Sequence, residues 1–164
     1  MMRGKHRNDE RINPFKKAIV RVLHLYFALS RGMTLGVRAA CYDDKGRIFL
    51  VRHTYLPGWY LPGGGVERGE TAAQALEKEL REEGNLQMTG SPTLLQCYLN
   101  LTASRRDHVL FYRVMVRQTA PRHPDREIAE SGFFALDALP DGVTPATRRR
   151  LDELERGGPY ADLW

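Results

Sequence analysis

The chain has 164 residues and a net charge of +5, with 42% apolar and 27% charged residues. This length suits one domain with a core large enough to fold without disulfides or a structural metal. The composition is typical of globular proteins and argues against a disordered chain, a coiled coil or a multi-span membrane protein. The two cysteines, Cys41 and Cys97, lie inside apolar runs, and we expect both to be buried.

The positive charge is concentrated at the N-terminus. Residues 1–32 carry eight basic and two acidic side chains, so the rest of the chain has a net charge of −1. A near-neutral body weakens the case for nucleic acid as a partner. The longest apolar stretch, residues 18–29, contains Arg21 and His24 and is too short to span a bilayer. Because no secretory signal is evident, we expect a cytoplasmic protein.

An amphipathic helix is predicted over residues 14–30. Apolar residues recur at helical spacing in and just before this range, namely Ile12, Phe15, Ile19, Val22, Leu23, Tyr26 and Phe27. We expect this helix to pack on its own domain or on a second copy of the chain in a homodimer. A helix on a membrane surface, with Lys16, Lys17 and Arg21 at the headgroups, is a weaker alternative. Contact with nucleic acid is the weakest.

We divide the chain into a basic arm and helix, residues 1–33, and a main domain, residues 34–164. Within the main domain, strand patterns are predicted over residues 35–42, 47–53, 93–102, 108–118 and 132–135. Helix signals occur twice, with Thr71 and Gln74 as a capping box, Gly84 and Asn85 as a helix end, and Thr144 and Pro145 as a second start. This order predicts an α+β or α/β fold around a mixed sheet.

Three carboxylates gather on one face of the first of these helices, residues 71–83. Glu79, Glu82 and Glu83 fall within about 100° of arc, where like charges repel unless a cation balances them. They adjoin an apolar stripe, and carboxylate oxygens in such a place suit Mg²⁺ or Mn²⁺. Taken alone, however, the helix fits a solvated acidic face better.

The loop before this helix reverses that preference. Residues 63–65 are three consecutive glycines, which let the backbone approach a ligand closely. Carbonyl groups in such a loop can bind a metal, and N–H groups can meet phosphate. A glycine-rich loop that leads at fixed spacing into a three-glutamate helix therefore favours metal-assisted phosphate chemistry.

These residues resemble the Nudix box, Gly-x5-Glu-x7-Arg-Glu-U-x-Glu-Glu-x-Gly-U, in which U is aliphatic. The chain has Gly64, then Glu70, then Lys78-Glu79-Leu80-Arg81-Glu82-Glu83-Gly84-Asn85-Leu86. Every carboxylate position matches, whereas Lys78 replaces the usual Arg and Asn85 the usual Gly. The resemblance extends from about Leu35 to Pro140 and leaves the N-terminal helix outside.

The resemblance to Nudix (MutT-like) hydrolases implies an α/β/α sandwich and a hydrolase that uses Mg²⁺ or Mn²⁺. The implied substrate is a small nucleotide, a nucleoside diphosphate linked to a group X. By position, Glu79 and Glu83 are catalytic metal ligands, and Glu82 supports them or binds a second ion. The resemblance makes the Gly63 carbonyl a further ligand. It assigns the loop-supporting role to Gly64, Glu70 and Lys78.

Residues outside the box complete the candidate site. Glu127 is the candidate general base and Glu130 the second candidate, with an ordinary surface role as the alternative for both. Four residues near the glycine loop are candidates for phosphate contact or base stacking, with core packing as their alternative: Arg52, Tyr55, Trp59 and Tyr60.

Two other functions stay open. The first is a non-catalytic nucleotide-binding or regulatory domain, which the retained carboxylates disfavour. The second is an enzyme that acts on the 5′ end of RNA, with the basic arm along the phosphates.

Overall fold

The computed structural model describes residues 14–164, and the chain divides into two compact units, residues 1–32 and 33–164. Most of the predicted basic arm, with Ile12 of the helix pattern, lies outside the described residues. The helix of the first unit, α1 (Pro14–Ser30), has the predicted bounds. Several of its apolar side chains are exposed, including Val22, Leu25, Tyr26 and Leu29. Within residues 14–164, no helix is long and apolar enough to cross a membrane.

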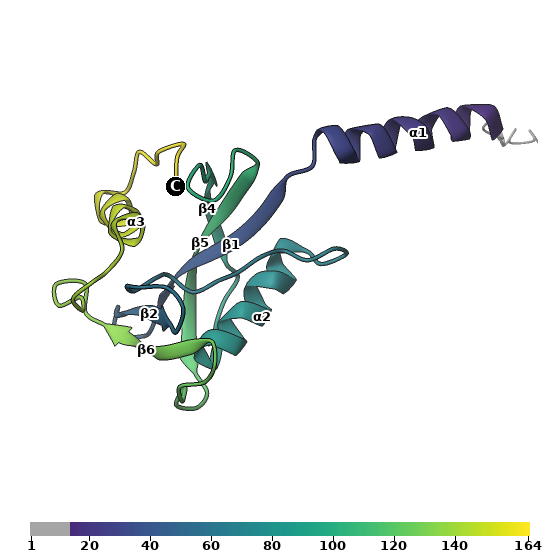
Figure 1. The fold of residues 1–164 in the computed structure, drawn as a ribbon. Helices are drawn as coiled ribbons and strands as arrows, with labels where there is room; N and C mark the ends of the chain where they lie inside the picture. The colour runs from purple at the N-terminus through teal and green to yellow at the C-terminus, as the bar shows by residue number, and fades with distance from the viewer. Residues whose placement is uncertain (1–13) are drawn as a thin grey trace, which may run out of the picture. The chain divides into compact units, whose positions relative to one another are not determined.

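A mixed six-stranded sheet forms the centre of the second unit (Figure 1). The strand order is β3-β5-β1-β2-β6, and β4 also pairs with β5. The parallel pair is β1 with β5, in which Thr34 lies opposite Asp107, and the other pairs are antiparallel. The strands are β1 (Thr34–Tyr42), β2 (Ile48–His53), β3 (Leu86–Met88), β4 (Thr93–Leu99), β5 (Asp107–Gln118) and β6 (Ile128–Phe134).

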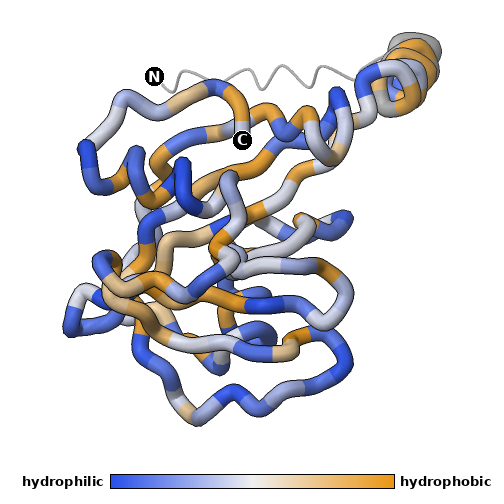
Figure 2. The backbone as a smooth tube through the Cα atoms, turned by 60° about the vertical axis from the view of Figure 1, so that its left-hand side comes forward, coloured by the Kyte–Doolittle hydropathy of each residue, from blue (hydrophilic) through white to orange (hydrophobic). Residues whose placement is uncertain are grey.

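Two helices, α2 (Ala72–Gly84) and α3 (Pro145–Arg156), pack against opposite faces of this sheet. Successive side chains of a strand point to opposite faces. Phe49 and Val51 of β2 therefore join one core cluster with Leu76 and Leu80 of α2, whereas Ile48 and Leu50 join a second cluster with Leu151 of α3. Figure 2 shows hydrophobic stretches along the strands and hydrophilic outer loops. The predicted α/β/α sandwich around a mixed sheet is confirmed.

Strand boundaries differ from the sequence prediction at three places. The three-residue β3 is too short to leave a periodic pattern and forms by pairing with the end of β5. β4 ends at Leu99, and β6 begins at Ile128, four residues before its predicted start at 132.

The prediction that both cysteines are buried is wrong for Cys97. Cys41 is buried in β1, but Cys97 is exposed on β4. Its neighbour Tyr98 points into the core, and strand alternation therefore turns Cys97 outward.

The predicted ends of α2 are present. Thr71 and Gln74 form a reciprocal capping box, with hydrogen bonds of 3.2 Å from the Gln74 N–H and 2.9 Å from the Thr71 N–H. At the other end Asn85 adopts a left-handed conformation with φ of 51°. Its side-chain amide donates to the carbonyl of Pro121 at 3.1 Å. Asn85 therefore both ends the helix and holds the loop after β5.

We expect Asn85→Ala to lower the free energy of unfolding by about 1–2 kcal/mol, because alanine is strained in the left-handed region. Asn85→Gly, which tolerates this conformation but also lacks the amide, should cost less than half as much. Urea unfolding followed by circular dichroism measures both. Equal losses in the two variants would contradict the left-handed cap as the cause.

Candidate active site

The glycine loop meets the acidic face of α2 at Glu83. This carboxylate is only 4% exposed and accepts a hydrogen bond of 2.7 Å from the N–H of Gly63. It is buried because it follows Leu76 and Leu80 along the face of α2 that packs on the sheet. An anionic side chain thus lies at the edge of the hydrophobic core.

Four further carboxylates share a cavity of about 520 Å³ with Glu83, namely Glu79, Glu82, Asp125 and Glu127. The Glu79 side chain is largely buried, at 17% exposure. Glu82 is more open and lies 3.6 Å from the Arg81 guanidinium. The structure therefore brings the three box carboxylates of α2 together with the candidate general base, which lies directly before β6.

Burial perturbs the ionisation of the two inner carboxylates. It raises the pKa of Glu83 to about 7, although the nearby charge of Arg38 opposes this shift. Burial also raises the pKa of Glu79. Burying an ionised carboxylate costs free energy unless a cation or several hydrogen bonds compensate it. Among residues 14–164, Glu83 has a single hydrogen bond, from Gly63. Its charge is therefore poorly compensated, and the oxygen-rich donor set fits a divalent cation.

Two glycines allow the loop to touch the acidic cluster. The carbonyls of Pro62 and Gly64 accept hydrogen bonds from β1, from the N–H groups of Ala39 at 3.0 Å and Val37 at 2.9 Å. A Cβ added to Gly64 would overlap the Glu79 carboxylate, and Gly63 has a φ of 138°, which other residues rarely adopt. The ligand role of the Gly63 carbonyl stays a prediction.

Lys78 ties the loop to the helix. Its ammonium lies 3.2 Å from a carboxylate oxygen of Glu70 and 3.9 Å from one of Glu79. Glu70 also accepts the N–H of Glu67 at 2.9 Å. That hydrogen bond and Lys78 together lower the pKa of Glu70.

Sequence reasoning missed His53, at the end of β2. It is 7% exposed, and its Nε2 lies 3.7 Å from Oε1 of Glu83. Burial and the charge of Arg38 lower its pKa. The alternation of Phe49, Val51 and His53 was the available signal, since it places all three on the face that α2 covers.

Arg38 of β1 was also missed. One guanidinium nitrogen is buried and has no hydrogen-bond partner within the described part of the chain. Its positive charge acts to lower the pKa of Glu79, Glu83 and His53. Arg38 also lines a second, larger cavity. An arginine in an otherwise apolar strand was the signal for it.

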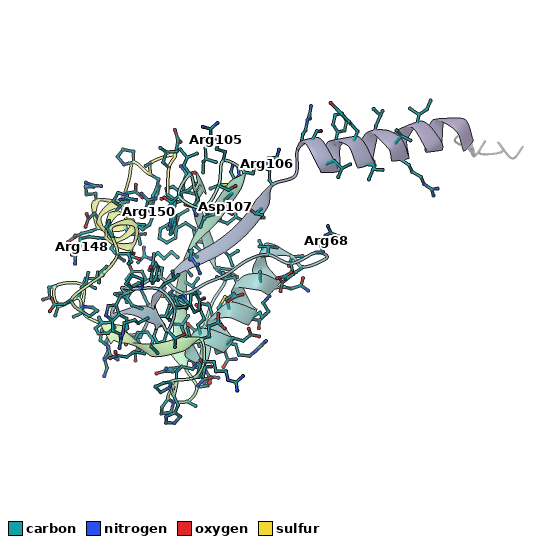
Figure 3. All side chains as sticks on the ribbon, in the orientation of Figure 1. Arg68, Arg105, Arg106, Asp107, Arg148 and Arg150 are labelled. Atoms are coloured by element: carbon teal, nitrogen blue, oxygen red, sulfur yellow. The ribbon has the colours of Figure 1, made fainter. Side chains whose placement is uncertain are left out.

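The larger cavity, of about 860 Å³, lies along β1, the glycine loop and the start of α3. Its walls are mainly apolar, and Asn100 and Asp107 add polar groups. Asp107 accepts hydrogen bonds from Thr34 at 2.7 Å and Asn100 at 2.8 Å. Figure 3 shows Asp107 at the start of β5, beside Arg105 and Arg106, which are exposed.

The four candidate substrate residues separate in the structure. Tyr60 lines the larger cavity, with its hydroxyl bonded to the Pro57 carbonyl at 2.9 Å. Tyr55 is 63% exposed, and its ring centroid lies 5.3 Å from that of His53.

The other two candidates have structural partners. Trp59 is buried in the hydrophobic core against Phe134, which agrees with core packing, the alternative to substrate contact. Arg52 pairs with Glu130 at 2.7 Å on the surface. The predicted phosphate contact, Arg52, and the second candidate base, Glu130, are therefore paired with each other.

The NUDIX domain family matches residues 32–154, and the chain belongs to this family. It is 40% identical over 122 residues to an RNA pyrophosphohydrolase of Halorhodospira halophila, a match covering 74% of this chain and 59% of the relative. The chain is 31% identical to a relative from Mycobacterium tuberculosis, a match covering 73% of this chain and 49% of the relative. It thus spans about half to three-fifths of the length of these curated relatives.

Solved structures show the same architecture. The MutT NUDIX hydrolase from Burkholderia pseudomallei superposes with a TM-score of 0.61 at 30% identity, covering 73% of this chain and 95% of that one. An ADP-ribose pyrophosphatase from Streptococcus suis superposes with a TM-score of 0.54 at 24% identity, covering 78% and 96% of the two chains. The second likeness concerns the fold alone.

We expect Gly64→Ala to weaken Mn²⁺ binding about tenfold or more, because the new methyl group displaces the Glu79 carboxylate. Gly65→Ala is the matched control, since a Cβ there meets no atom within 4 Å. Titration of free Mn²⁺ by electron paramagnetic resonance measures both affinities. Unchanged binding in Gly64→Ala would argue against Glu79 as a ligand.

Proposed function

We propose that this chain is a metal-dependent pyrophosphohydrolase that cleaves a nucleoside diphosphate linked to a group X. The observation that carries the proposal is the buried Glu83 carboxylate, held 2.7 Å from the Gly63 N–H and beside Glu79 in an open cavity. Membership of the NUDIX family supports it.

The proposed cofactor is Mg²⁺ or Mn²⁺. Glu79, Glu83 and the Gly63 carbonyl would hold the cation, and Glu82 would support them or bind a second ion. When bound, the cation offsets negative charge on the phosphate oxygens. The proposed supporting role of Gly64, Glu70 and Lys78 is to keep the loop against these ligands.

Glu127 is the proposed general base. The backbone fixes it at the cavity wall, since its carbonyl accepts the N–H of Thr54 at 2.9 Å and its own N–H donates to Asp125 at 2.8 Å. In the proposed reaction, water attacks a phosphorus of the pyrophosphate bond and Glu127 accepts the proton. The bond from that phosphorus to the bridging oxygen breaks, which releases two phosphate-bearing products.

Arg38 is the proposed phosphate contact. Its position beside both the acidic cluster and the larger cavity suits a group that bridges a metal-bound diphosphate and the rest of the substrate. A guanidinium can bind phosphate oxygens bidentately. The larger cavity, with Tyr60 on its wall, would then take the nucleoside or X.

A second candidate is hydrolysis at the 5′ end of RNA, which the relative named RNA pyrophosphohydrolase supports. Its reaction at the phosphates would use the same carboxylates. A 5′-triphosphate RNA therefore belongs in the substrate panel, and the slope of its binding against salt reports how many phosphates the protein contacts.

Glu83→Gln should lower the catalytic rate a hundredfold or more, because the amide cannot balance a cation as a carboxylate does. Phosphate release is measured with Mg²⁺ or Mn²⁺ on nucleoside triphosphates, ADP-ribose, NADH, nucleotide sugars, dinucleoside polyphosphates and 5′-triphosphate RNA. Glu77→Gln, an exposed position on the same helix, is the control and should keep its rate. If the natural chain releases no phosphate from any substrate of the panel, a non-catalytic binding domain is favoured.

Arg38→Gln should raise KM about tenfold, equivalent to about 1.4 kcal/mol of lost substrate binding, while Mn²⁺ affinity changes little. Arg52→Gln, whose side chain is paired with Glu130, should change KM less than threefold. Steady-state kinetics on the substrate found in the panel compare the two. The reverse order would restore Arg52 as the phosphate contact.

A further inference from the structure

His53 is a buried imidazole to which the proposed reaction gives no part. Strand alternation in β2 turns it toward α2, and only 7% of the residue is exposed. The rings of Tyr55 and Tyr60 lie beside it, with centroid distances of 5.3 and 5.6 Å. Neighbouring aromatic rings and strand pairing therefore restrict where the imidazole can point.

Neither nitrogen of this imidazole has a hydrogen bond among the described residues. Nδ1 is buried without a partner, and the 3.7 Å from Nε2 to Glu83 exceeds hydrogen-bond length. Leaving a buried polar group without a hydrogen-bond partner is energetically unfavourable. An unsatisfied imidazole at this depth therefore indicates a partner that the protein atoms do not supply.

The imidazole faces two carboxylates. One ligand atom from each of His53, Glu83 and Glu127 lies within 4.8 Å of the others. The pairing of β2 with β6 creates this group, because His53 lies opposite Ile128 and the next N–H, of Thr54, bonds to Glu127. Three donors from three different elements thus converge at one point.

We propose that His53 is a nitrogen ligand of a divalent cation shared with Glu83 and Glu127, and that this set favours first-row transition ions over Mg²⁺. The inference rests on the proposed cation site and adds to it two donors, His53 and one carboxylate oxygen of Glu127, and a metal preference. The other carboxylate oxygen of Glu127 is left for the proposed role as general base. Imidazole nitrogen suits transition ions, whereas Mg²⁺ prefers oxygen ligands. Mn²⁺ is the suitable probe because it binds both nitrogen and oxygen ligands.

The test is pulsed electron paramagnetic resonance of the full chain loaded with Mn²⁺. A directly bound imidazole gives nitrogen modulation of the electron spin echo, and its frequencies change when the histidines carry ¹⁵N. We expect this signature in the natural chain and its loss in His53→Gln. His123→Gln, in the exposed loop before β6, is the control and should retain it.

The second measurement is the ratio of Mg²⁺ to Mn²⁺ dissociation constants, with Mg²⁺ measured by competition. His53→Gln should lower this ratio about tenfold or more, because it removes the nitrogen donor. A residue that only orients Glu83 would weaken both ions equally and leave the ratio unchanged.

The outcomes separate this inference from the proposed function. Mn²⁺ that binds the natural chain without nitrogen modulation overturns the role of His53, while its loss in Glu83→Gln would still support the carboxylate site. Modulation that persists in His53→Gln also overturns the inference. Failure of the natural chain to bind Mn²⁺ at all would count against the proposed function itself. The ¹⁵N experiment on the natural chain needs no variant, and the absence of ¹⁵N-sensitive modulation there overturns the inference even if His53→Gln has a folding defect.

Discussion

The hydrogen bond from Gly63 to the buried carboxylate of Glu83 is the contact on which the local architecture depends. It requires a backbone N–H where a side chain would not fit, and therefore a loop with glycines. It also requires α2 to lie flat on the sheet, which Leu76 and Leu80 achieve by burial. The close contact of loop and helix then brings the box carboxylates beside β1 and β2, from which Arg38 and His53 extend.

A second buried carboxylate shows what a structural anion looks like in the same fold. Glu153 of α3 accepts hydrogen bonds from Arg150 at 2.9 Å, Tyr98 at 2.7 Å and the N–H of Ala161 at 3.1 Å. This network locks α3 onto β4 without need of a ligand. Glu83, equally buried, has a short bond to Gly63 and a histidine beyond hydrogen-bond reach. Because the charge of Glu83 has fewer hydrogen-bonding partners than that of Glu153, this difference supports the proposal that Glu83 binds a cation.

Local features of this fold could be read from the sequence, and features set by distant strands could not. The capping box at Thr71, the left-handed Asn85 and the carboxylate spacing on α2 involve residues within a few positions of each other. By contrast, the burial of Trp59 depends on Phe134, and the meeting of His53 with Glu127 depends on the register of β2 and β6. Pairings across about 75 residues leave no periodic trace in the sequence, which is why Trp59 resembled a stacking residue.

The lysine at the usual arginine position of the box has a physical consequence. Arginine can bind two carboxylate oxygens as a planar fork, whereas the ammonium of Lys78 is a single point charge. That charge lies 3.2 Å from Glu70 and 3.9 Å from Glu79, so it connects the loop and the cluster at once. The Glu67 N–H supplies Glu70 with a second contact. The ion pair of Lys78 with Glu70 thus attaches the loop to α2 despite the loss of the fork, and the bond from Glu67 orders Glu70 within the loop. The positive charge also stays close enough to Glu79 to reduce repulsion among the carboxylates.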